Sequence, residues 1–366
     1  MNLSLLYSIF FDIFVAVIIL IFLGLTFIAS YRSKNAEVFQ KYNGRALFIV
    51  PCRGKDFTLE ENLKAIAEST GDRYQVVAVV DSEDDEALGA IKSAGIRYIV
   101  SSPVCSNCSG KVRAIYSAVM SFPDYPVYVI ADSDILPKRS WADDLLSPFT
   151  LEDTGLSTTF PYFVPRGGFW SRVKLVWGFV GLGMMESPVT RFGWGGSLAF
   201  RSSLLDSDRK DFFLSYVSDD VALTKICKSM GLKIRYVPSA APYINSPDDF
   251  KTFMEWANRQ TALSIYSTPS VFRFGVIFYG STVLIELTSI VLSVLVFPAF
   301  IILLSPIIIT AIRNVRRAGR MPVAVLLISL FIPFLYLYNL LHARRMTQIQ
   351  WRGRTYKLRN EDDPAG

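Results

Sequence analysis

Two carboxylates one residue apart follow a short apolar stretch in VYVIADSDILP, residues 127–137. The apolar residues predict a buried β-strand, and Asp132 and Asp134 stand directly after it. Acidic side chains at positions i and i+2 that leave a strand can converge on one hard cation. Magnesium and manganese prefer oxygen ligands, and phosphate oxygens complete their shell where the protein supplies few carboxylates. The spacing therefore predicts a divalent-cation site beside a phosphate-bearing ligand.

Further acidic positions carry candidate chemistry. Asp81 follows the apolar stretch VVAVV, although an acid there could also simply form a turn. Asp219 and Asp220 stand at the predicted N-terminus of a helix, where a cap explains one acid but not both. We therefore consider this pair as the source of a general base. The glycines of 193–196 would allow a ligand to approach the backbone closely.

The sequence lacks the residues that several other kinds of enzyme or metal site require. The one histidine, His342, ends an apolar segment and has no serine or cysteine beside it, so a Ser–His–Asp hydrolase is excluded. No G-x-x-x-x-G-K-[ST] loop occurs, which argues against a P-loop kinase or ATPase. Cys105 and Cys108 form half of a zinc-ribbon spacing, but a plain loop is the simpler interpretation. No disulfide is expected if this region lies in a reducing compartment.

The acids belong to a regular alternation of predicted strands and helices. Strands are predicted at 45–51, 74–80, 96–100 and 127–131, with helices at 59–70, 84–94 and 111–122 between them. Helices between short, nearly continuous apolar strands favour an α/β fold with a mostly parallel sheet covered on both faces. Ligands bind such sheets at the carboxyl ends of the strands, where Asp81, Asp132 and Asp134 are expected.

Apolar blocks flank this α/β region in a chain that is 51% hydrophobic. At about 20 residues per crossing, residues 3–29 allow one membrane span, 274–312 two and 321–341 one. A signal peptide fits poorly, because the basic residues follow the first block instead of preceding it. Arg32, Lys34 and Lys41 therefore predict an integral membrane protein whose central domain is cytoplasmic. The predicted organisation is a transmembrane anchor at 1–31, an α/β domain at 32–270, a membrane region at 271–343 and a basic tail at 344–366.

The net charge of +6 comes largely from the flank 313–320 and the tail. We assign it to the membrane surface, so a nucleic-acid partner is not implied.

Taken in order, these segments resemble family-2 glycosyltransferases of the GT-A fold, and among them the membrane-bound ceramide-glucosyltransferase-like branch. The correspondence runs from about residue 50 to 260, with a further fragment, IQWRGRTYKLR, near the C-terminus. The resemblance implies a Rossmann-like domain, a nucleotide-sugar donor and a magnesium or manganese ion. ADSDILP resembles the family's metal-binding D-x-D, which makes Asp132 and Asp134 metal ligands and places Asp132 beside the donor.

The same resemblance assigns roles to other positions. In VVDSEDD it places Asp81 against the nucleotide base, and in SGKVRAIYSA it places Lys111 near the donor diphosphate. IVPCRGKDFTLEENL resembles the opening strand and helix, with Pro51 on the donor side. In SDDVALTKICKSMG it makes Asp220 the catalytic base and Asp219 its acidic predecessor.

One motif departs from the family. The expected Q/R-x-x-R-W corresponds to WANRQ at 256–260, which keeps Arg259 but has Trp256 in the first position and Gln260 in the last. We place these three residues on the acceptor side. In processive polysaccharide synthases the missing tryptophan helps to bind the growing glycan, so the departure argues against chain extension.

The resemblance and the membrane segments together predict an inverting transfer of a sugar, from a UDP-hexose such as UDP-glucose, to a hydroxyl of a membrane lipid. A processive polysaccharide synthase is the first alternative. The second is a non-enzymatic membrane protein such as a transporter subunit, which should line its spans with ionisable groups. Asp12 and Glu286 are the main ionisable residues in the apolar blocks.

The last apolar block poses a separate question of topology. Basic residues flank 321–341 on both sides, and such flanks favour the cytoplasmic face. Pro333 in the middle of the block favours a bend. Of a third span and a re-entrant hairpin, we predict the hairpin. The tail would then bring three residues near the donor diphosphate, where guanidiniums can pair with phosphate oxygens: Trp351, Arg352 and Arg354.

Overall fold

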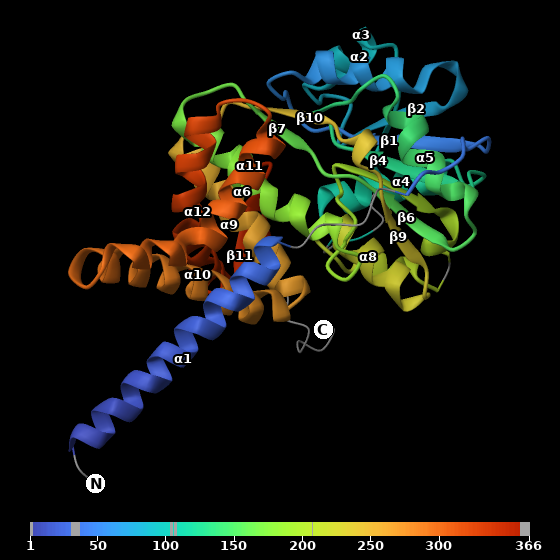
Figure 1. Cartoon of the computed structure of the whole chain (residues 1–366). Helices are drawn as coiled ribbons and strands as arrows, with labels where there is room; N and C mark the ends of the chain where they lie inside the picture. Colours follow the sequence, from blue (N-terminus) through green and yellow to red (C-terminus); the bar gives the residue numbers. More distant parts are fainter. Residues whose placement is uncertain (1–2, 31–36, 103–104, 106–107, 207, 359–366) are drawn as a thin grey trace.

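The computed structural model describes residues 3–30, 37–102, 105, 108–206 and 208–358. Arg32, Lys34 and the tail beyond residue 358 therefore lie outside the described part. An α/β domain and a helical region lie side by side, and helix α1 projects from the helical region (Figure 1).

A seven-stranded sheet forms the centre of the α/β domain. Its parallel core places β1 between β2 and β4, whereas β8 runs antiparallel to both β4 and β6. The mostly parallel sheet predicted from the alternating pattern is confirmed. In spatial order the strands are β3 (Arg97–Val100), β2 (Gln75–Val80), β1 (Ala46–Pro51), β4 (Val127–Ala131), β8 (Ser197–Arg201), β6 (Thr154–Thr158) and β9 (Lys233–Tyr236).

Helices cover both faces of this sheet, which is why its central strands are apolar throughout. Phe48 and Val50 of β1 face one hydrophobic core, while Leu47 and Ile49 face the other. The first core contains α2 (Leu59–Thr70), α3 (Leu88–Ser93) and α5 (Trp141–Leu146). The second contains α4 (Gly110–Ser121), α7 (Lys210–Leu214) and α8 (Asp219–Ser229).

A second, small sheet connects the α/β domain to the helical region. It consists of β5 (Ile135–Leu136), β10 (Tyr243–Ser246) and β7 (Tyr162–Pro165). Helices α6 (Phe169–Glu186) and α9 (Phe250–Ser267) follow β7 and β10 directly. Short 3-10 helices complete the domain: η1 (Gly71–Arg73), η2 (Ser147–Thr150), η3 (Ser202–Leu205) and η4 (Pro238–Ala240).

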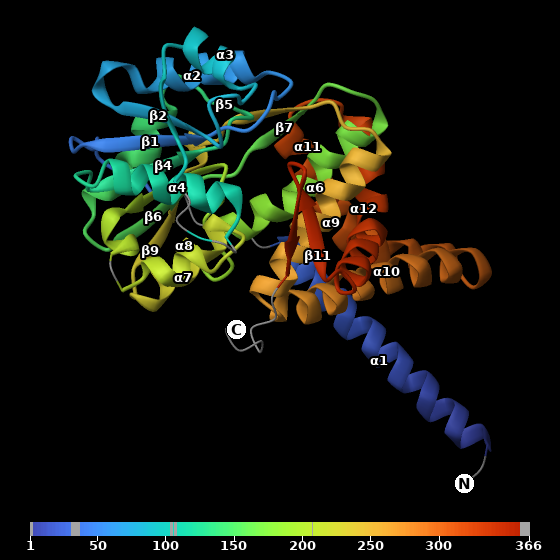
Figure 2. The ribbon, with the colours of Figure 1, turned by 180° about the vertical axis from the view of Figure 1, so that it is seen from behind.

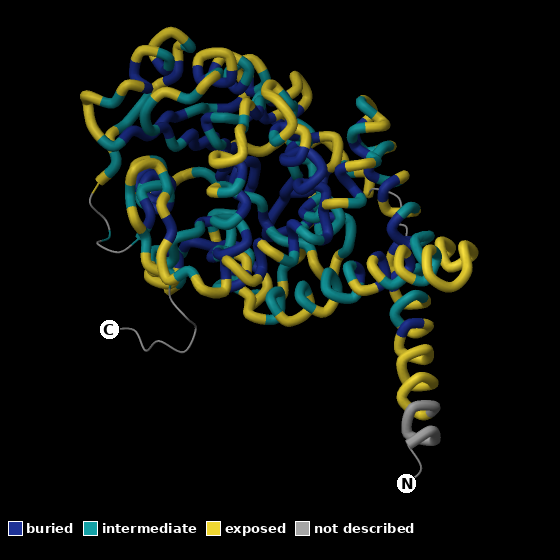
Figure 3. The backbone as a smooth tube through the Cα atoms, turned by 90° about the vertical axis from the view of Figure 1, so that its left-hand side faces the viewer, coloured by how far each residue is buried: buried dark blue, intermediate teal, exposed yellow. Residues whose placement is uncertain are grey.

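Four helical segments in the described part are long and apolar enough to cross a membrane. They are α1 (Leu3–Ser30), α10 (Ser270–Leu295), the consecutive η5 (Pro298–Leu304) and α11 (Ser305–Ala318), and α12 (Pro322–Ala343). Figure 3 shows the projecting N-terminal helix coloured mostly as exposed.

Helix α12 runs without interruption through Pro333, so the hairpin turn predicted within this block is wrong. Tyr336 and Asn339, after the proline, hydrogen-bond to helices α6 and α9, which support α12 on this side. After α12 the chain forms a hairpin of β11 (Gln348–Trp351) and β12 (Arg354–Lys357).

Candidate active site

Asp132 and Asp134 lie at the carboxyl end of β4, as the sequence predicted. The backbone N–H of Asp132 donates to the carbonyl of Gly196 (3.0 Å), which ties this end of β4 to the start of β8. The chain then turns into β5, where the N–H of Ile135 donates to the carbonyl of Asp132 (3.3 Å). The two acids thus leave a completely buried strand at the edge where α/β sheets bind ligands.

Asp134 has the surroundings of a cation ligand. Its Oδ1 atom is buried and has no hydrogen-bond partner among the described residues. Burial raises the pKa of Asp134 to about 6, and the nearby carboxylates of Asp132 and Asp56 add to this shift. No three His, Cys, Asp or Glu side chains of the described part gather around one metal position. The unpartnered Oδ1 of Asp134 is the observation that fits a divalent cation, whose remaining ligands would then have to come from a bound phosphate.

Asp56 belongs to this acidic cluster, although sequence reasoning missed it. The hydroxyl of Ser133, between the two acids of the motif, donates to Asp56 Oδ2 (2.6 Å). Arg352 from the tail approaches the same carboxylate, with Nη1 2.8 Å from Oδ1 and Nη2 2.9 Å from Oδ2. The sequence did hold one signal for this residue. Asp56 follows the predicted strand β1, just as Asp132 and Asp134 follow β4, and parallel strands end at the same edge of a sheet.

Lys111 joins the metal-site acids to the acids of α8. Its Nζ lies 2.7 Å from Asp132 Oδ1 and 3.4 Å from Asp219 Oδ1, and it donates to the carbonyl of Gly195 (2.9 Å). Burial alone would lower the pKa of Lys111, but the two carboxylates outweigh it and raise the pKa. A Cβ on Gly195 would lie 2.7 Å from Asp219 Oδ2, so this close arrangement requires glycine.

The two acids at the start of α8 have different surroundings. Asp219 is 2% exposed, and its Oδ2 has no partner among the described residues. Burial raises the pKa of Asp219 to about 7, against the opposing effect of Lys111. Asp220 is partly exposed and accepts hydrogen bonds from the N–H groups of Gly195 (3.1 Å) and Val221 (2.8 Å) and from a serine hydroxyl. The structure thus holds Asp220 in a fixed orientation at the surface of the site.

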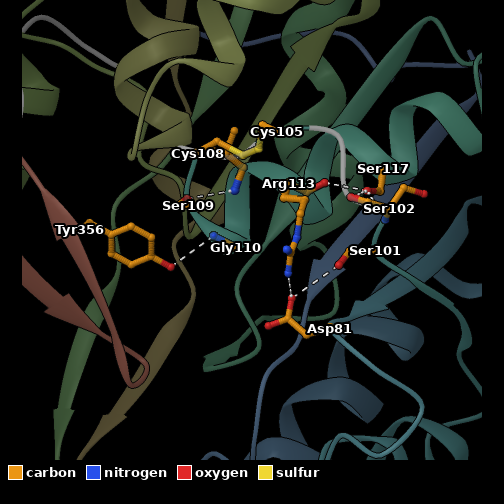
Figure 4. Close-up of a disulfide and its surroundings, with 11 residues drawn as sticks. Asp81, Ser101, Ser102, Cys105, Cys108, Ser109, Gly110, Arg113, Ser117 and Tyr356 are labelled. Atoms are coloured by element: carbon orange, nitrogen blue, oxygen red, sulfur yellow. Dashed lines mark hydrogen bonds and ion pairs between the residues drawn. A yellow bond between two sulfur atoms is a disulfide. The ribbon is translucent and has the colours of Figure 1, made fainter. Parts of the chain in front are cut away.

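Asp81 is surrounded by arginines. Arg113 Nη2 lies 2.6 Å from its Oδ1, while Arg354 Nη2 (3.0 Å) and Arg53 Nε (3.6 Å) approach Oδ2. Figure 4 shows Asp81 pointing toward Arg113 and Ser101. Pro51 ends the neighbouring strand β1, in register with Val79 of the strand that leads to Asp81.

The C-terminal hairpin brings Arg352 to Asp56 and Arg354 to Asp81, at the carboxyl edge of the main sheet. Its turn contains Arg352 and Gly353, with φ of 50° and 72°, the positive values of a tight two-residue hairpin. The guanidinium of Arg354 lies against the start of α4, where a Cβ on Gly110 would be 2.5 Å from Nη1. Trp351 instead lies beside Tyr356 of the same hairpin, with ring centroids 6.5 Å apart.

The N-terminus of α4 faces this hairpin. The N–H of Gly110 donates to the hydroxyl of Tyr356 (3.3 Å), and Ser109 caps the helix by accepting from Val112 N (3.1 Å; Figure 4). The N–H groups of Gly110 and Val112 already have partners, so it is the charge of Lys111 and the positive end of the helix dipole that make this end of α4 suit a diphosphate.

Just before this helix, Cys105 and Cys108 form a disulfide, contrary to the expectation that the chain would hold none. Their Cα atoms are 5.9 Å apart, a separation within the range of disulfides. Sequence alone, read through the redox compartment, did not predict this pairing.

The three residues assigned to the acceptor side have separate environments on α9. Arg259 lies within electrostatic reach of the site: burial and the charge of Arg352 lower its pKa, whereas Asp134 opposes this change. The ring of Trp256 is partly buried, with Lys174 Nζ 4.7 Å from its centroid and the ring centroid of Trp177 at 4.9 Å. Gln260, which follows Arg259 on α9, is half-buried.

Comparison with solved structures shows the fold. The chain is similar to a mannosyltransferase from Pyrobaculum calidifontis in complex with GDP-mannose and Mn2+, with 18% identity, a TM-score of 0.51, and 89% of this chain and 93% of that chain covered. A glucosyl-3-phosphoglycerate synthase from Mycobacterium tuberculosis, in complex with Mn2+ and UDP-glucose, gives 16% identity, a TM-score of 0.42, and coverage of 61% and 79%. The first similarity confirms the predicted GT-A fold.

Comparison with protein families is more specific. None of the curated proteins searched matches the chain. The sequence model of glycosyl transferase family 21 matches residues 13–363, so it includes the apolar helices and the tail as well as the α/β domain. The non-enzymatic alternative is therefore wrong, and the chain belongs to glycosyl transferase family 21.

Proposed function

We propose that this glycosyltransferase moves a hexose from a UDP-sugar to a hydroxyl group of a membrane lipid, with inversion at the anomeric carbon. The proposal of a lipid acceptor rests on one observation: the apolar helix α10 follows α9 almost directly. Helix α9 holds Arg259 beside the acids and ends at Ser267, and the apolar helix α10 begins at Ser270. A head group can reach the acids while its lipid tails stay beside α10.

The donor half of the site is proposed on charge and geometry. Asp132 and Asp134 would hold a magnesium or manganese ion, which when bound supplies positive charge against the leaving diphosphate. Lys111 and the start of α4 face the same position and would bind phosphate oxygens directly. Asp81 would accept a hydrogen bond from the uracil base. The similar mannosyltransferase contains GDP-mannose and Mn2+, which supports a nucleotide sugar and a divalent cation here.

Asp220 is the proposed base. It would take the proton from the acceptor hydroxyl as the oxygen attacks the anomeric carbon, a contribution of roughly 100- to 10,000-fold in rate. Its hydrogen bonds with Gly195 and Val221 keep the carboxylate oriented for this step. A single displacement of this kind inverts the configuration.

A processive synthase remains the alternative. The packing of Trp256 favours single transfer, because a ring already in contact with Lys174 and Trp177 is not free to stack on a growing glycan. The basic flank before the α/β domain supports a cytoplasmic site, where UDP-sugars would bind.

A donor and acceptor screen tests the proposal. Purified full-length protein in lipid bilayers is incubated with UDP-hexoses and GDP-mannose, with and without added lipid extract, and nucleotide release and lipid products are measured. We expect UDP release that depends on lipid and yields a product one hexose heavier, with none from Asp220→Asn. A ladder of longer glycans would support the processive synthase, and release unaffected by lipid would contradict a lipid acceptor.

A further inference from the structure

Helix α12 has the length of a membrane span, yet its surroundings differ from those of the other apolar helices. Its 22 residues extend over about 33 Å, enough to cross a hydrocarbon core of about 30 Å. Half of its apolar window is buried inside the protein, compared with 17–22% for the other three candidates. A helix that crosses must leave its ends on opposite sides, so the contacts of the two ends decide whether it does.

The chain just before α12 lies against β7, in the small sheet that joins the α/β domain to the helical region. The carbonyl of Ala318 accepts a hydrogen bond from the hydroxyl of Tyr162 in β7 (2.7 Å). Arg320 lies over the ring of the same tyrosine, 5.6 Å from its centroid. Arg317 also forms an ion pair with Glu186 at the end of α6 (2.6 Å).

The C-terminal end returns to the same domain. The hairpin that follows α12 places Arg352 on Asp56 and Arg354 on Asp81, both at the carboxyl edge of the main sheet. Figure 2 shows β11 on the side of the helical region that faces the α/β domain. Both ends of α12 are therefore on the side of the membrane that holds the active site.

The C-terminal part of α12 packs on helices that carry exposed charge. Trp177 Nε1 of α6 donates to Asn339 Oδ1 (3.1 Å), and Asn339 Nδ2 donates to Asn258 Oδ1 of α9 (2.8 Å). Arg172 on α6 and Glu255 on α9 are exposed, and each lies within five residues of one of these contacts. Charges at the depth of a bilayer centre cost several kcal/mol each, which argues against that depth for these parts of α6 and α9 and for the end of α12 that packs on them.

The outer face of α12 is nevertheless apolar from one end to the other. The exposed residues recur at helical spacing along one side, with exposed fractions of 69, 60, 46, 52 and 48%. We call this face the α12 stripe: Val323, Leu327, Phe331, Tyr338 and Leu341. Basic residues stand beyond both ends of the stripe, at Arg320 and at Arg344 and Arg345, as expected if both ends lie at the level of anionic head groups.

We propose that α12 lies in the plane of the membrane surface and that the α12 stripe contacts the boundary between head groups and acyl chains. The parts that enter the hydrocarbon core are α1 and the hairpin of α10 and η5. Both project beyond the layer of α6, α9 and α12 in two opposite views (Figures 1 and 2). The far end of that hairpin is entirely apolar and exposed, with Leu295 at 76% and Ile302 at 67%.

The helix that carries the stripe packs against α1 and α10, which is why we assign the stripe to lipid and not to a protein partner. Leu330, next to Phe331 of the stripe, packs in the same cluster as Ile18 of α1 and Ile285 of α10. An in-plane α12 would hold α9, and with it Arg259, at the height of lipid head groups. This topology does not depend on which lipid is the acceptor.

Spin-label depth measurements test the proposal. Single cysteines replace Val323, Leu327, Phe331 and Leu341 in full-length protein in bilayers, on a background whose native cysteines are shown not to label. Collision rates with oxygen and with a water-soluble nickel complex then give the depth of each label. We expect all four at about the same shallow depth, roughly 5–10 Å below the phosphates. A span would instead place Phe331 deepest, about 15 Å into the core, with shallow ends.

Two control positions calibrate the depths, Leu284→Cys near the middle of α10 as a deep site and Glu68→Cys on exposed α2 as an aqueous site. Cysteines at Met321 and Arg345, on either end of α12, provide an independent measurement of sidedness. We expect both to react with an impermeant thiol reagent from the same side as Glu68→Cys. Reaction from opposite sides would overturn the proposal. Labels at Leu327 and Phe331 that are shielded from oxygen, together with cross-linking of these cysteines into dimers, would also overturn it, because a second copy of the chain and not lipid would then cover the stripe.

Discussion

At the scale of single residues, the site holds two buried carboxylates, each with one oxygen that has no partner in the described part. Asp134 belongs to the acids at the end of β4, and Asp219 belongs to the pair at the start of α8. Lys111 lies between the two groups, against Asp132 on one side and Asp219 on the other. Lys111 therefore connects the two acidic groups, and each group keeps one oxygen that a bound ligand, ion or proton could occupy.

Replacing Asp134 with Asn tests the cation site. A neutral amide is a weaker ligand for a hard cation, and metal stabilisation of the leaving group contributes several kcal/mol. We expect transfer to fall by at least about 100-fold with little change in Tm. Nucleotide release at saturating Mn2+ is measured, with Asp72→Asn on the exposed surface as the control. Near-normal turnover in the variant, or full activity of the wild type in excess chelator, would remove the metal role.

Asp220→Asn tests the base. Turnover should fall by about 100- to 10,000-fold, because the proton acceptor is lost. The Kd for UDP should stay within about twofold, since Asp220 acts on the acceptor and not on the donor. Asp219→Asn is the matched variant, one position away on the same helix. If it proves inactive while Asp220→Asn remains active, the roles of the two acids are exchanged.

Asp219 also makes stability depend on pH. Its pKa is about 7 in the folded protein and near 3.8 when exposed, so between these values the folded state holds a proton that the unfolded chain has lost. Stability from this group is present at low pH and is lost as pH rises through about 4 to 7. Asp219→Asn, measured in EDTA, should raise Tm at pH 8 by at least about 2 °C more than at pH 5. Asp72→Asn, on the exposed surface, should change Tm equally at both pH values. Equal changes in Tm for Asp219→Asn would contradict the raised pKa of Asp219.

Local spacing explains which site residues the sequence could predict. Asp132 with Asp134 and Asp219 with Asp220 are each visible as pairs within three residues. The contact between Asp56 and Ser133 joins positions 77 residues apart, and it depends on the loop after β1 reaching across to β4. Such a contact follows from tertiary packing, which a single sequence does not display.

At the scale of elements, the C-terminal hairpin shows a partial success of the same kind. The basic flanks and the expected re-entrant block predicted that the tail lies near the donor diphosphate, and the structure pairs Arg352 with Asp56 and Arg354 with Asp81. The strand pair itself was not predicted, although Gly353 after Arg352 marks its turn. Short strands of four residues carry too little periodicity to be recognised.

Arg352→Gln combined with Arg354→Gln tests whether the hairpin binds the donor. Hydrogen bonds from charged groups are worth about 1.5–3 kcal/mol, so losing guanidinium contacts with phosphate should weaken UDP binding by about 10-fold or more. Kd is measured by calorimetry in the presence of Mn2+. Arg345→Gln, on an exposed arginine before the hairpin, is the control and should bind normally. Unchanged affinity in the double variant would leave the hairpin with a structural role only.

Helix α12 shows where local rules fail at this scale. Pro333 and the basic flanks predicted a bend, because local sequence does not reveal which helices lie alongside. The bonds of Asn339 to Trp177 and Asn258 supply that missing support. The strands β1 and β4 were predicted correctly, since burial on both faces of a parallel sheet leaves a continuous apolar stretch that is visible without any partner.

At the scale of the whole molecule, composition predicted the four apolar segments but not their roles. A chain that leaves the α/β domain at α9 and returns to it at Arg352 must cross the membrane an even number of times. Three apolar segments lie between these points, so at least one of them does not cross. The basic flanks on both sides of 321–341 already placed its two ends on one side, and the contacts of the hairpin support the same side.

The side on which the site lies can be tested at Thr355, an exposed residue of β12. Because Arg354 beside it pairs with Asp81, a cysteine at Thr355 must share the compartment of the α/β domain. Lys41→Cys, exposed at the start of that domain, is the matched control. If the basic flank after α1 keeps the domain in the cytoplasm, an impermeant thiol reagent should label both variants in opened cells or inverted vesicles and neither in intact cells. Labelling of both in intact cells would reverse the orientation but keep the hairpin in the site. Labelling of only one would separate the tail from the active site and contradict its pairing with Asp81.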